Sequence, residues 1–280
     1  MNNIHLIDET FDEHFTDTYH LSLSFDLKGI TYCMLDTRVN KCVLLKHVVI
    51  GDYAENIALE KLEEIIIKDE LLSKKFKSAA FICRGTANAL IPDEIFKPEE
   101  IKNLFEFQNT LNELDELHFT KIKSAASVLI FSLPSRIADI VKRKIPNISF
   151  YHDNYIMIHN ACSVPSSEDM RISFNGSSFT ILINKQNTIT FYNSFNYHAP
   201  ADVLFYLTGV AGSMNLKPAE IKVLVMGEYE KDSEMQNLLK QYFTSIRFMK
   251  PSTDIEYSYK FNEVDAHIFA NLFNSLTCVS

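Results

Sequence analysis

Few residues in this chain have types and spacing that could support chemistry. Cys83 precedes Arg84 at the end of an apolar run, and a cation beside a thiol can activate it. His152, Asp153 and His159 lie where a strand is expected to end and a helix to begin, which could bring metal ligands together. No positioned base or metal-ligand spacing accompanies either group. We therefore interpret Cys83 as a core cysteine and the histidines as loop residues.

Longer motifs for common chemistries are absent from the sequence. It contains no GxGxxG, GxxxxGK[ST], GxSxG or HExxH, which excludes the usual dinucleotide, P-loop, esterase and zinc-protease signatures. Only 7 of the 280 residues are glycine, against a usual share of about 7%. The aromatic runs at residues 105–107 and 191–197 lack a basic surround, so we interpret them as core and interface aromatics.

The charge balance argues against nucleic-acid binding. The chain has 27 Lys and Arg against 36 Asp and Glu, a formal net charge of -9, which repels phosphate backbones. The sequence has no apolar run long enough for a transmembrane helix, and its first twenty residues include acidic residues but no Lys or Arg. We therefore expect a cytoplasmic protein with no transmembrane segment.

The cysteines predict a reducing compartment. Five are present, an odd number without CxxC spacing, and most lie in apolar runs. We expect buried reduced thiols. A disulfide between Cys33 and Cys42, facing each other across a hairpin, is the alternative.

The first half of the chain alternates strands and helices. Short runs of alternating or continuous apolar residues, bounded by turn formers, predict strands at residues 21–25, 30–35, 42–50, 128–131 and 148–151. Apolar residues at helical spacing predict helices at residues 52–66, 135–145 and 155–162. The proline at position 146 ends the second of these helices.

The second half repeats this order. Strands are expected at residues 171–174, 179–183, 188–192, 221–226 and 246–248. One helix is expected to open at Pro200, another to be capped by Ser233, and a last one to cover residues 266–276. Each half therefore runs βββαβαβα, which indicates an internal duplication.

The first half has about fifty additional residues. We place them at about 74–125, between its first helix and fourth strand, as an α+β insert with a strand at 79–83 and a helix that opens at Pro98. The predicted halves are residues 1–165 and 166–280, joined by a polar linker at 165–169.

This order of elements resembles the actin-like ATPase superfamily. Four stretches, at residues 21–50, 90–96, 128–134 and 147–152, look like an uncharacterised bacterial family of about this length that has the same fold. The resemblance covers nearly the whole chain, and its motifs are apolar. It implies an α/β protein with a duplicated ribonuclease-H-like (actin-like ATPase) fold and an insert in the first half.

The resemblance also implies a place for a nucleotide. In active members, the turn between the first two strands of each half holds a phosphate, with an acidic residue on the metal and backbone amides on the oxygens. In this chain the first such turn contains Asp26, Lys28 and Gly29. Asp26 matches the acidic position, whereas Gly29 comes one place late.

The second turn departs further from the pattern. It begins with Asn175, where active members have an acid, and continues with Gly176, Ser177 and Ser178. After the fourth strand of the second half the superfamily has paired glycines that receive the base, but here Gly227 is followed by Glu228. The alternative for both turns is a tight hairpin, which these residue types favour for local backbone reasons.

Two functional hypotheses follow. The first is a cytoplasmic, catalytically degenerate member of the fold that uses no cofactor and acts as an interaction or scaffold protein. It has a protein partner that contacts the aromatic insert at residues 79–119. The second is an ATP-binding switch or ATPase of the same superfamily, in which magnesium and the phosphates are held by Asp26, Lys28 and the second turn.

Overall fold

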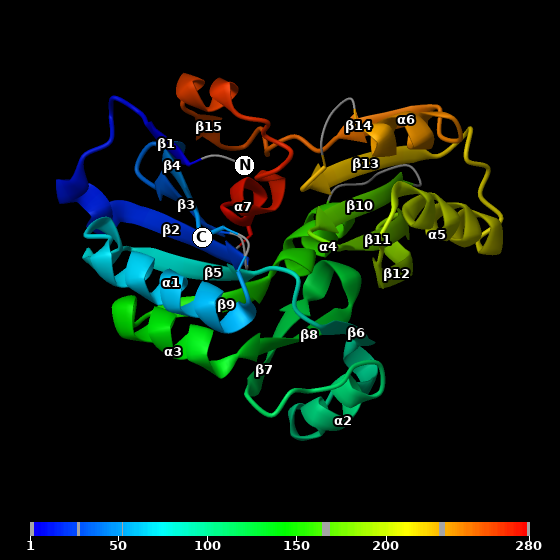
Figure 1. The fold of residues 1–280 in the computed structure, drawn as a ribbon, viewed down its shortest axis with the longest axis horizontal. Coiled ribbons are helices and arrows are strands. Elements are labelled where there is room, and N and C mark those ends of the chain that lie inside the picture. The colour runs from blue at the N-terminus through cyan, green and yellow to red at the C-terminus, as the bar shows by residue number, and fades with distance from the viewer. Residues whose placement is uncertain (1–2, 27–28, 52, 164–168, 230–232, 279–280) are drawn as a thin grey trace.

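The computed structural model describes residues 3–26, 29–51, 53–163, 169–229 and 233–278. Lys28 and most of the expected linker lie outside these residues. The first half is built on a seven-stranded sheet with the order β1-β4-β3-β2-β5-β9, in which β15 also pairs with β4 (Figure 1). Its strands are β1 (Ile4–Ile7), β2 (Tyr19–Asp26), β3 (Gly29–Asp36), β4 (Lys41–Val49), β5 (Ser78–Cys83), β9 (Ile148–His152) and β15 (Glu256–Tyr257).

Helices cover both faces of this sheet, which explains its continuous apolar runs. Alternate residues of β2, including Leu21 and Leu23, pack with α1 (Glu55–Lys68) and α3 (Ser135–Lys144) on one face. The opposite face packs against α4 (Asp153–Ser163) and α7 (Ala270–Ser275). These two helices lie between the sheets of the two halves, where α7 contacts both β2 and β13 (Lys222–Gly227) (Figure 1).

The second half has a five-stranded sheet with the order β12-β11-β10-β13-β14. Its outer face packs against α5 (Pro200–Ser213) and α6 (Glu234–Lys240) (Figure 1). As expected, α5 begins at Pro200, and the Ser233 hydroxyl accepts the backbone N–H of Gln236 at 3.3 Å. The strands are β10 (Asp169–Asn175), β11 (Ser178–Lys185), β12 (Thr188–Asn196), β13 (Lys222–Gly227) and β14 (Ser245–Phe248).

The expected duplication is confirmed by the strand order. Three consecutive strands, from β2 in the first half and from β10 in the second, form an antiparallel meander, and the next two strands of the same sheet follow in parallel beside the first of them. Both halves therefore share the order 3-2-1-4-5 when counting starts at β2 and at β10 and leaves out β1, β15 and the insert. The division of the chain at residues 165 and 166 stays a prediction, because the linker is not described.

The predicted places of two strands were wrong. Residues 79–83 were assigned to the insert, but they form β5, whose Phe81 pairs with Leu23 in the first sheet. Residues 128–131 were assigned to the main sheet, but they belong to β8 (Ser127–Pro134) in a separate three-stranded sheet. Both runs are short, apolar and buried, so their pattern could not show which sheet each one joins.

The insert therefore follows β5 instead of preceding the fourth strand. Its sheet has the order β6-β8-β7 and carries one short helix, α2 (Ile101–Glu106), below the two halves in Figure 1. A separate small core with Phe105 at its centre holds this helix on the sheet. The outer strands are β6 (Asn88–Pro92) and β7 (Asp115–Ile122).

Candidate functional site

The first turn of the predicted nucleotide site forms part of a charged cluster. Asp26 ends β2, and its Oδ1 accepts the backbone N–H of Gly29 at 3.0 Å. Arg84, directly after β5, donates from Nη1 to Asp26 Oδ2 at 3.0 Å and from Nη2 to Glu228 Oε1 at 3.5 Å. We call these three residues, Asp26, Arg84 and Glu228, the Arg84 cluster. It joins the first half to the second, because Glu228 follows β13.

The Arg84 cluster is shielded from solvent. The side chains of Arg84, Asp26 and Glu228 are 15%, 17% and 23% exposed, so their attraction is screened less than at an open surface. His47 packs beside it, and a Cβ on Gly29 would lie 2.8 Å from His47 Cε1. Burial lowers the pKa of His47 and so favours the neutral ring, whereas the nearby Asp26 carboxylate has the opposite, smaller effect.

Gly227 has a structural reason to be glycine. Its φ is +82°, and a Cβ there would lie 2.1 Å from the carbonyl oxygen of Phe174 in β10. Its N–H donates to the carbonyl of His267 at 3.0 Å. The space left beside Arg84 and Gly227 is only about 20 Å³. Gly227 therefore serves a close approach between two strands and the segment before α7.

The second predicted turn is a β-hairpin between β10 and β11. Gly176 has a φ of +56°, and its carbonyl accepts the Tyr197 hydroxyl at 2.8 Å. The Ser178 hydroxyl donates to the Asn175 carbonyl at 3.0 Å, and Ser177 is exposed. The Asn175 amide nitrogen is buried and has no hydrogen-bond partner among the described residues. The Asn175 amide lies close to the backbone of Gly85, where an added Cβ would be 3.0 Å from the amide nitrogen.

The structure thus divides the predicted site residues between two places. Asp26, Gly29 and Gly227 lie at or beside the Arg84 cluster, whereas Asn175 and Ser178 line a neighbouring cavity. Gly176 and Ser177 belong to the hairpin turn that borders this cavity, and Lys28 lies outside the described residues.

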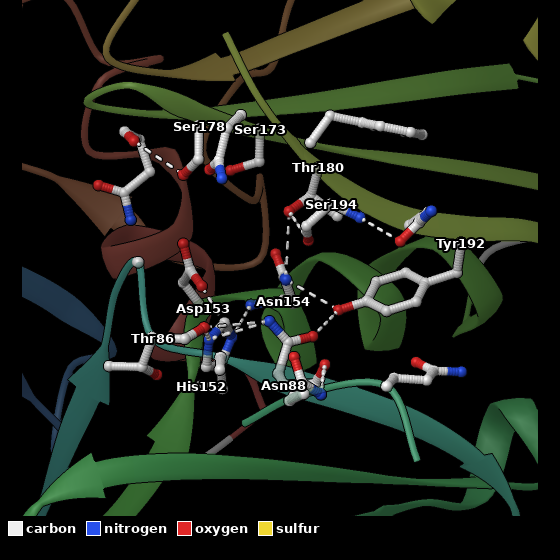
Figure 2. Close-up of a pocket in the computed structure, with 18 residues that line it drawn as sticks. Thr86, Asn88, His152, Asp153, Asn154, Ser173, Ser178, Thr180, Tyr192 and Ser194 are labelled. Carbon is white, nitrogen blue, oxygen red and sulfur yellow. Dashed lines mark hydrogen bonds and ion pairs between the residues drawn. The ribbon is translucent and has the colours of Figure 1, made fainter. Parts of the chain in front are cut away.

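The cavity has a volume of about 380 Å³ and a strongly polar lining (Figure 2). Of its eighteen lining residues, seven carry a side-chain amide and six carry a hydroxyl. They come from the loop between β5 and β6, the first residue of β6, the start of the segment that follows α2, the end of β9, the start of α4, and strands β10 to β12. The first half, its insert and the second half therefore all contribute walls.

Hydrogen bonds hold these walls together. Asn154, at the start of α4, donates from Nδ2 to the Tyr192 hydroxyl of β12 at 2.8 Å and to Thr180 Oγ1 at 3.3 Å. Tyr192 in turn donates to Asn88 Oδ1 of the insert (Figure 2). Burial raises the pKa of the Tyr192 phenol, so it stays a neutral hydrogen-bonding group.

His152 and Asp153 form the floor of the cavity. Both are buried, and His152 Nδ1 lies 2.9 Å from Asp153 Oδ1 and 3.0 Å from the donating N–H of Asn154. The other ring nitrogen lies 3.2 Å from the carbonyl of Thr86. His152 therefore belongs to a buried network and is not the loop residue that we expected. No cluster of three or more His, Cys, Asp or Glu that could hold a metal occurs within the described residues.

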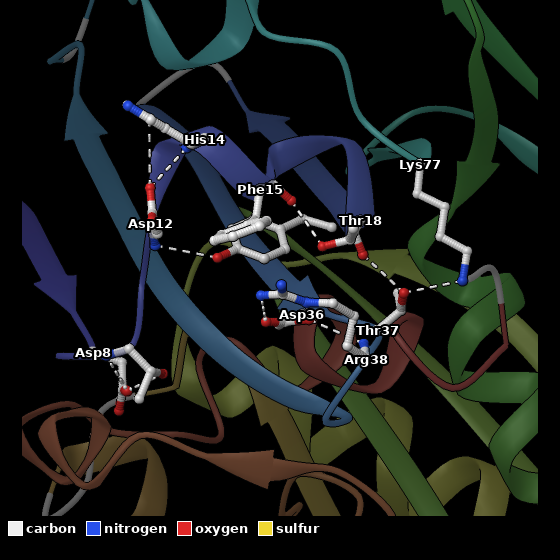
Figure 3. A network of polar contacts seen from close by, with 11 residues as sticks. Asp8, Asp12, His14, Phe15, Thr18, Asp36, Thr37, Arg38 and Lys77 are labelled. Atoms are coloured by element: carbon white, nitrogen blue, oxygen red, sulfur yellow. Dashed lines mark hydrogen bonds and ion pairs between the residues drawn. The ribbon is translucent and has the colours of Figure 1, made fainter.

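A third polar network lies at the β3–β4 turn, at the end of β3 opposite to Gly29 (Figure 3). Arg38 makes a bidentate pair with buried Asp36, at 3.0 Å and 2.7 Å, and its guanidinium lies over the Phe15 ring at 4.3 Å. The hydrogen bond from Arg38 holds the pKa of Asp36 below its usual range, despite burial. These contacts fasten the β3–β4 turn to the segment before β2.

Sequence reasoning missed most of the cavity. Tyr192 was included among the core and interface aromatics, and Asn88 and Asn154 were not singled out. Arg84 was considered only as a neighbour of Cys83, whose burial raises its pKa and confirms a core cysteine. The one available signal was polar residues, such as Ser173 and Thr180, within otherwise apolar strands.

Comparison with known proteins identifies the fold and the family. A model of the family DUF3822, described as a protein of unknown function, matches residues 8–246. A solved structure from Bacteroides thetaiotaomicron, a protein with actin-like ATPase fold and unknown function, is 17% identical with a TM-score of 0.79, covering 96% of this chain and 99% of that chain. A PilM-PilN type IV pilus biogenesis complex is 12% identical with a TM-score of 0.56, covering 92% and 98%.

No curated protein matches the sequence. In the part of the chain that the structure describes, no helix has the length and apolar character needed to span a bilayer. The likeness to the two solved structures is one of fold, and it agrees with the duplicated sheets and their shared strand order. The chain has an actin-like ATPase fold and belongs to the DUF3822 family.

Proposed function

We propose that this protein is a non-catalytic interaction or scaffold protein whose nucleotide site is degenerate. The observation that carries the proposal is the placement of Arg84 between Asp26 and Glu228. A magnesium ion held by Asp26 would take a carboxylate oxygen as its ligand. Here one oxygen of Asp26 accepts the Gly29 N–H and the other accepts Arg84, so a metal would have to compete with the positively charged guanidinium.

A protein partner is the second part of the proposal. The fold is also present in a PilM-PilN complex, so it is compatible with a role in assembly. In this chain the insert carries two large apolar side chains that are almost fully exposed, Phe107 at 87% and Leu114 at 81%. Exposed apolar groups of this size are suited to a protein interface. We place the partner on the insert and the protein in the cytoplasm, in keeping with its five free cysteines, four of which are buried.

Thermal unfolding with and without millimolar ATP and Mg²⁺ tests the nucleotide part. A ligand of the native state at a hundred times its Kd adds roughly 2.7 kcal/mol of stability. We expect no change in the midpoint beyond the effect of magnesium alone. A rise of several degrees that is lost in Asp26→Ala would contradict the proposal and favour the ATP-binding switch.

Affinity purification from the native cell tests the partner part. We expect the double variant Phe107→Ser, Leu114→Ser to lose proteins that the unmodified chain captures. The matched control is Phe205→Ser on α5, because Phe205 is also 72% exposed but lies outside the insert. If both variants retain the same proteins, the insert is not the contact surface.

A further inference from the structure

The cavity beside the Arg84 cluster contains buried polar groups that the protein itself does not satisfy. Thr86 Oγ1 and Asn175 Nδ2 are both buried without a hydrogen-bond partner among the described residues, and both residues line the cavity. A polar group that is buried without a hydrogen-bond partner lowers the stability of the fold. Such a cost at two neighbouring positions of one cavity is recovered when a ligand supplies the missing partners after a small side-chain rotation.

The charge of the lining argues against an anion. No lysine or arginine lines the cavity within the described part of the chain, and its one carboxylate, Asp153, lies against His152. A phosphate would therefore meet no cation there and one acidic group. Most ligand pockets are lined mainly by apolar side chains, whereas amides and hydroxyls dominate this lining. An apolar ligand would leave those groups unpaired.

The lining instead matches a ligand that carries many hydroxyl groups. Side-chain amides and hydroxyls can both donate and accept, as a ligand hydroxyl does, so each group has a complementary partner. A volume of about 380 Å³ is at the small end of the usual range for ligand pockets, about 300–1,000 Å³.

The walls of the cavity are held in position before a ligand arrives. The chain of hydrogen bonds from Asn154 through Tyr192 to Asn88 links α4, the second sheet and the insert. Within the insert, Asn109 donates to the Asn88 carbonyl at 3.1 Å and so holds two of its segments together. A preorganised polar site loses less conformational entropy on binding than a flexible one.

We propose that this cavity binds a small uncharged polyhydroxylated molecule, a sugar or polyol, with Thr86 and Asn175 among its hydrogen-bonding partners. This site is separate from the Arg84 cluster and from the partner surface on the insert. Its test is therefore independent of the proposed scaffold function.

The experiment is a thermal unfolding screen of the intact chain with neutral sugars at millimolar concentration. The panel contains pentoses, hexoses, N-acetylhexosamines, disaccharides and inositols, with inorganic phosphate and ATP·Mg²⁺ as anionic probes. We expect at least one neutral member to raise the midpoint by about 2–4 °C at ten times its Kd. Saturation-transfer NMR on the protein with that sugar checks that the two are in direct contact.

Variants separate binding at the cavity from a general solvent effect. Thr86→Val and Asn175→Ala remove unpaired groups without breaking a side-chain hydrogen bond in the described structure, and Ser194→Tyr fills the cavity from an exposed position on β12. We expect all three to lose most of the shift. Thr188→Val and Asn237→Ala, exposed and outside the lining, make matching chemical changes and should keep it.

Three outcomes would overturn the proposal. The first is a panel in which no neutral member shifts the midpoint. The second is an equal shift in all variants, which indicates exclusion of sugar from the protein surface. The third is a shift with phosphate or ATP that disappears in Asn175→Ala, which would assign the cavity to an anion.

Discussion

The Arg84 cluster and the polar cavity lie side by side, but they differ in whether their polar groups have partners within the protein. In the cluster, Arg84 contacts the carboxylates of both halves, and the remaining space is about 20 Å³. In the cavity, about 380 Å³ is surrounded by amides and hydroxyls, and two buried groups lack partners among the described residues. Polar groups that already have partners stabilise the fold, whereas those without partners remain available to a ligand.

The largest effect is expected from Gly227→Ala. An alanine Cβ would collide with the Phe174 carbonyl at a φ that disfavours any side chain, and we expect a loss of about 3 kcal/mol or more in the free energy of unfolding. Urea denaturation measures this loss. Gly209→Ala on α5 is the control, since its Cβ would meet nothing within 4 Å and should add about 0.5–1 kcal/mol. A fully stable Gly227→Ala would reopen a ligand-binding role for this glycine.

Next in size is Arg84→Met. Removing the cation leaves two partly buried carboxylates, Asp26 and Glu228, without their shared partner, and we expect a loss of about 1.5–3 kcal/mol. Arg136→Met is the matched control, because Arg136 is 45% exposed and its 3.5 Å contact with Glu63 should contribute about 0.5 kcal/mol or less. Equal denaturation midpoints for the two variants would show that the Arg84 cluster does not hold the halves together.

Asp36→Asn measures how much a carboxylate paired with an arginine contributes to stability at a place away from both regions. The pKa of Asp36 is lower in the folded protein, so its stabilisation is present above the unfolded value near 3.8 and is lost as the pH falls through the folded value. We expect the variant to lose about 1 kcal/mol at pH 7. Urea denaturation at pH 7, 5 and 3 should show the difference from the unmodified chain closing with acidity. A difference that grows toward pH 3 would contradict this sign.

The smallest effects are expected from Thr86→Val and Asn175→Ala without ligand. Each removes a buried group that has no protein partner, so the free energy of unfolding should stay within about 0.5 kcal/mol of the unmodified chain or rise slightly. The same urea titrations test this. A loss of 2 kcal/mol from either variant would mean that the group is structural, and the contrast between the cavity and the cluster would weaken.

More of the fold than of the candidate site could be predicted from the sequence. Alternating apolar residues and turn formers located most strands, and the repeated order of elements led to the duplicated architecture. The short strands β1 and β15 were missed, because four and two residues carry too little pattern. The cavity depends on contacts such as that between Tyr192 and Asn88, which are 104 positions apart, and no local pattern marks such a pair.

The pairing of β15 with β4 has a consequence for how the protein is made. The Asn40 amide donates to the Asp254 carbonyl across 214 positions, and α7 also contacts the first sheet. A chain still emerging from the ribosome lacks these late elements, so the part of the first sheet that α7 covers stays exposed until synthesis reaches them. A chain that ends after β14 would lack β15 and α7, and we expect the apolar surface left uncovered on its first sheet to promote aggregation and proteolysis.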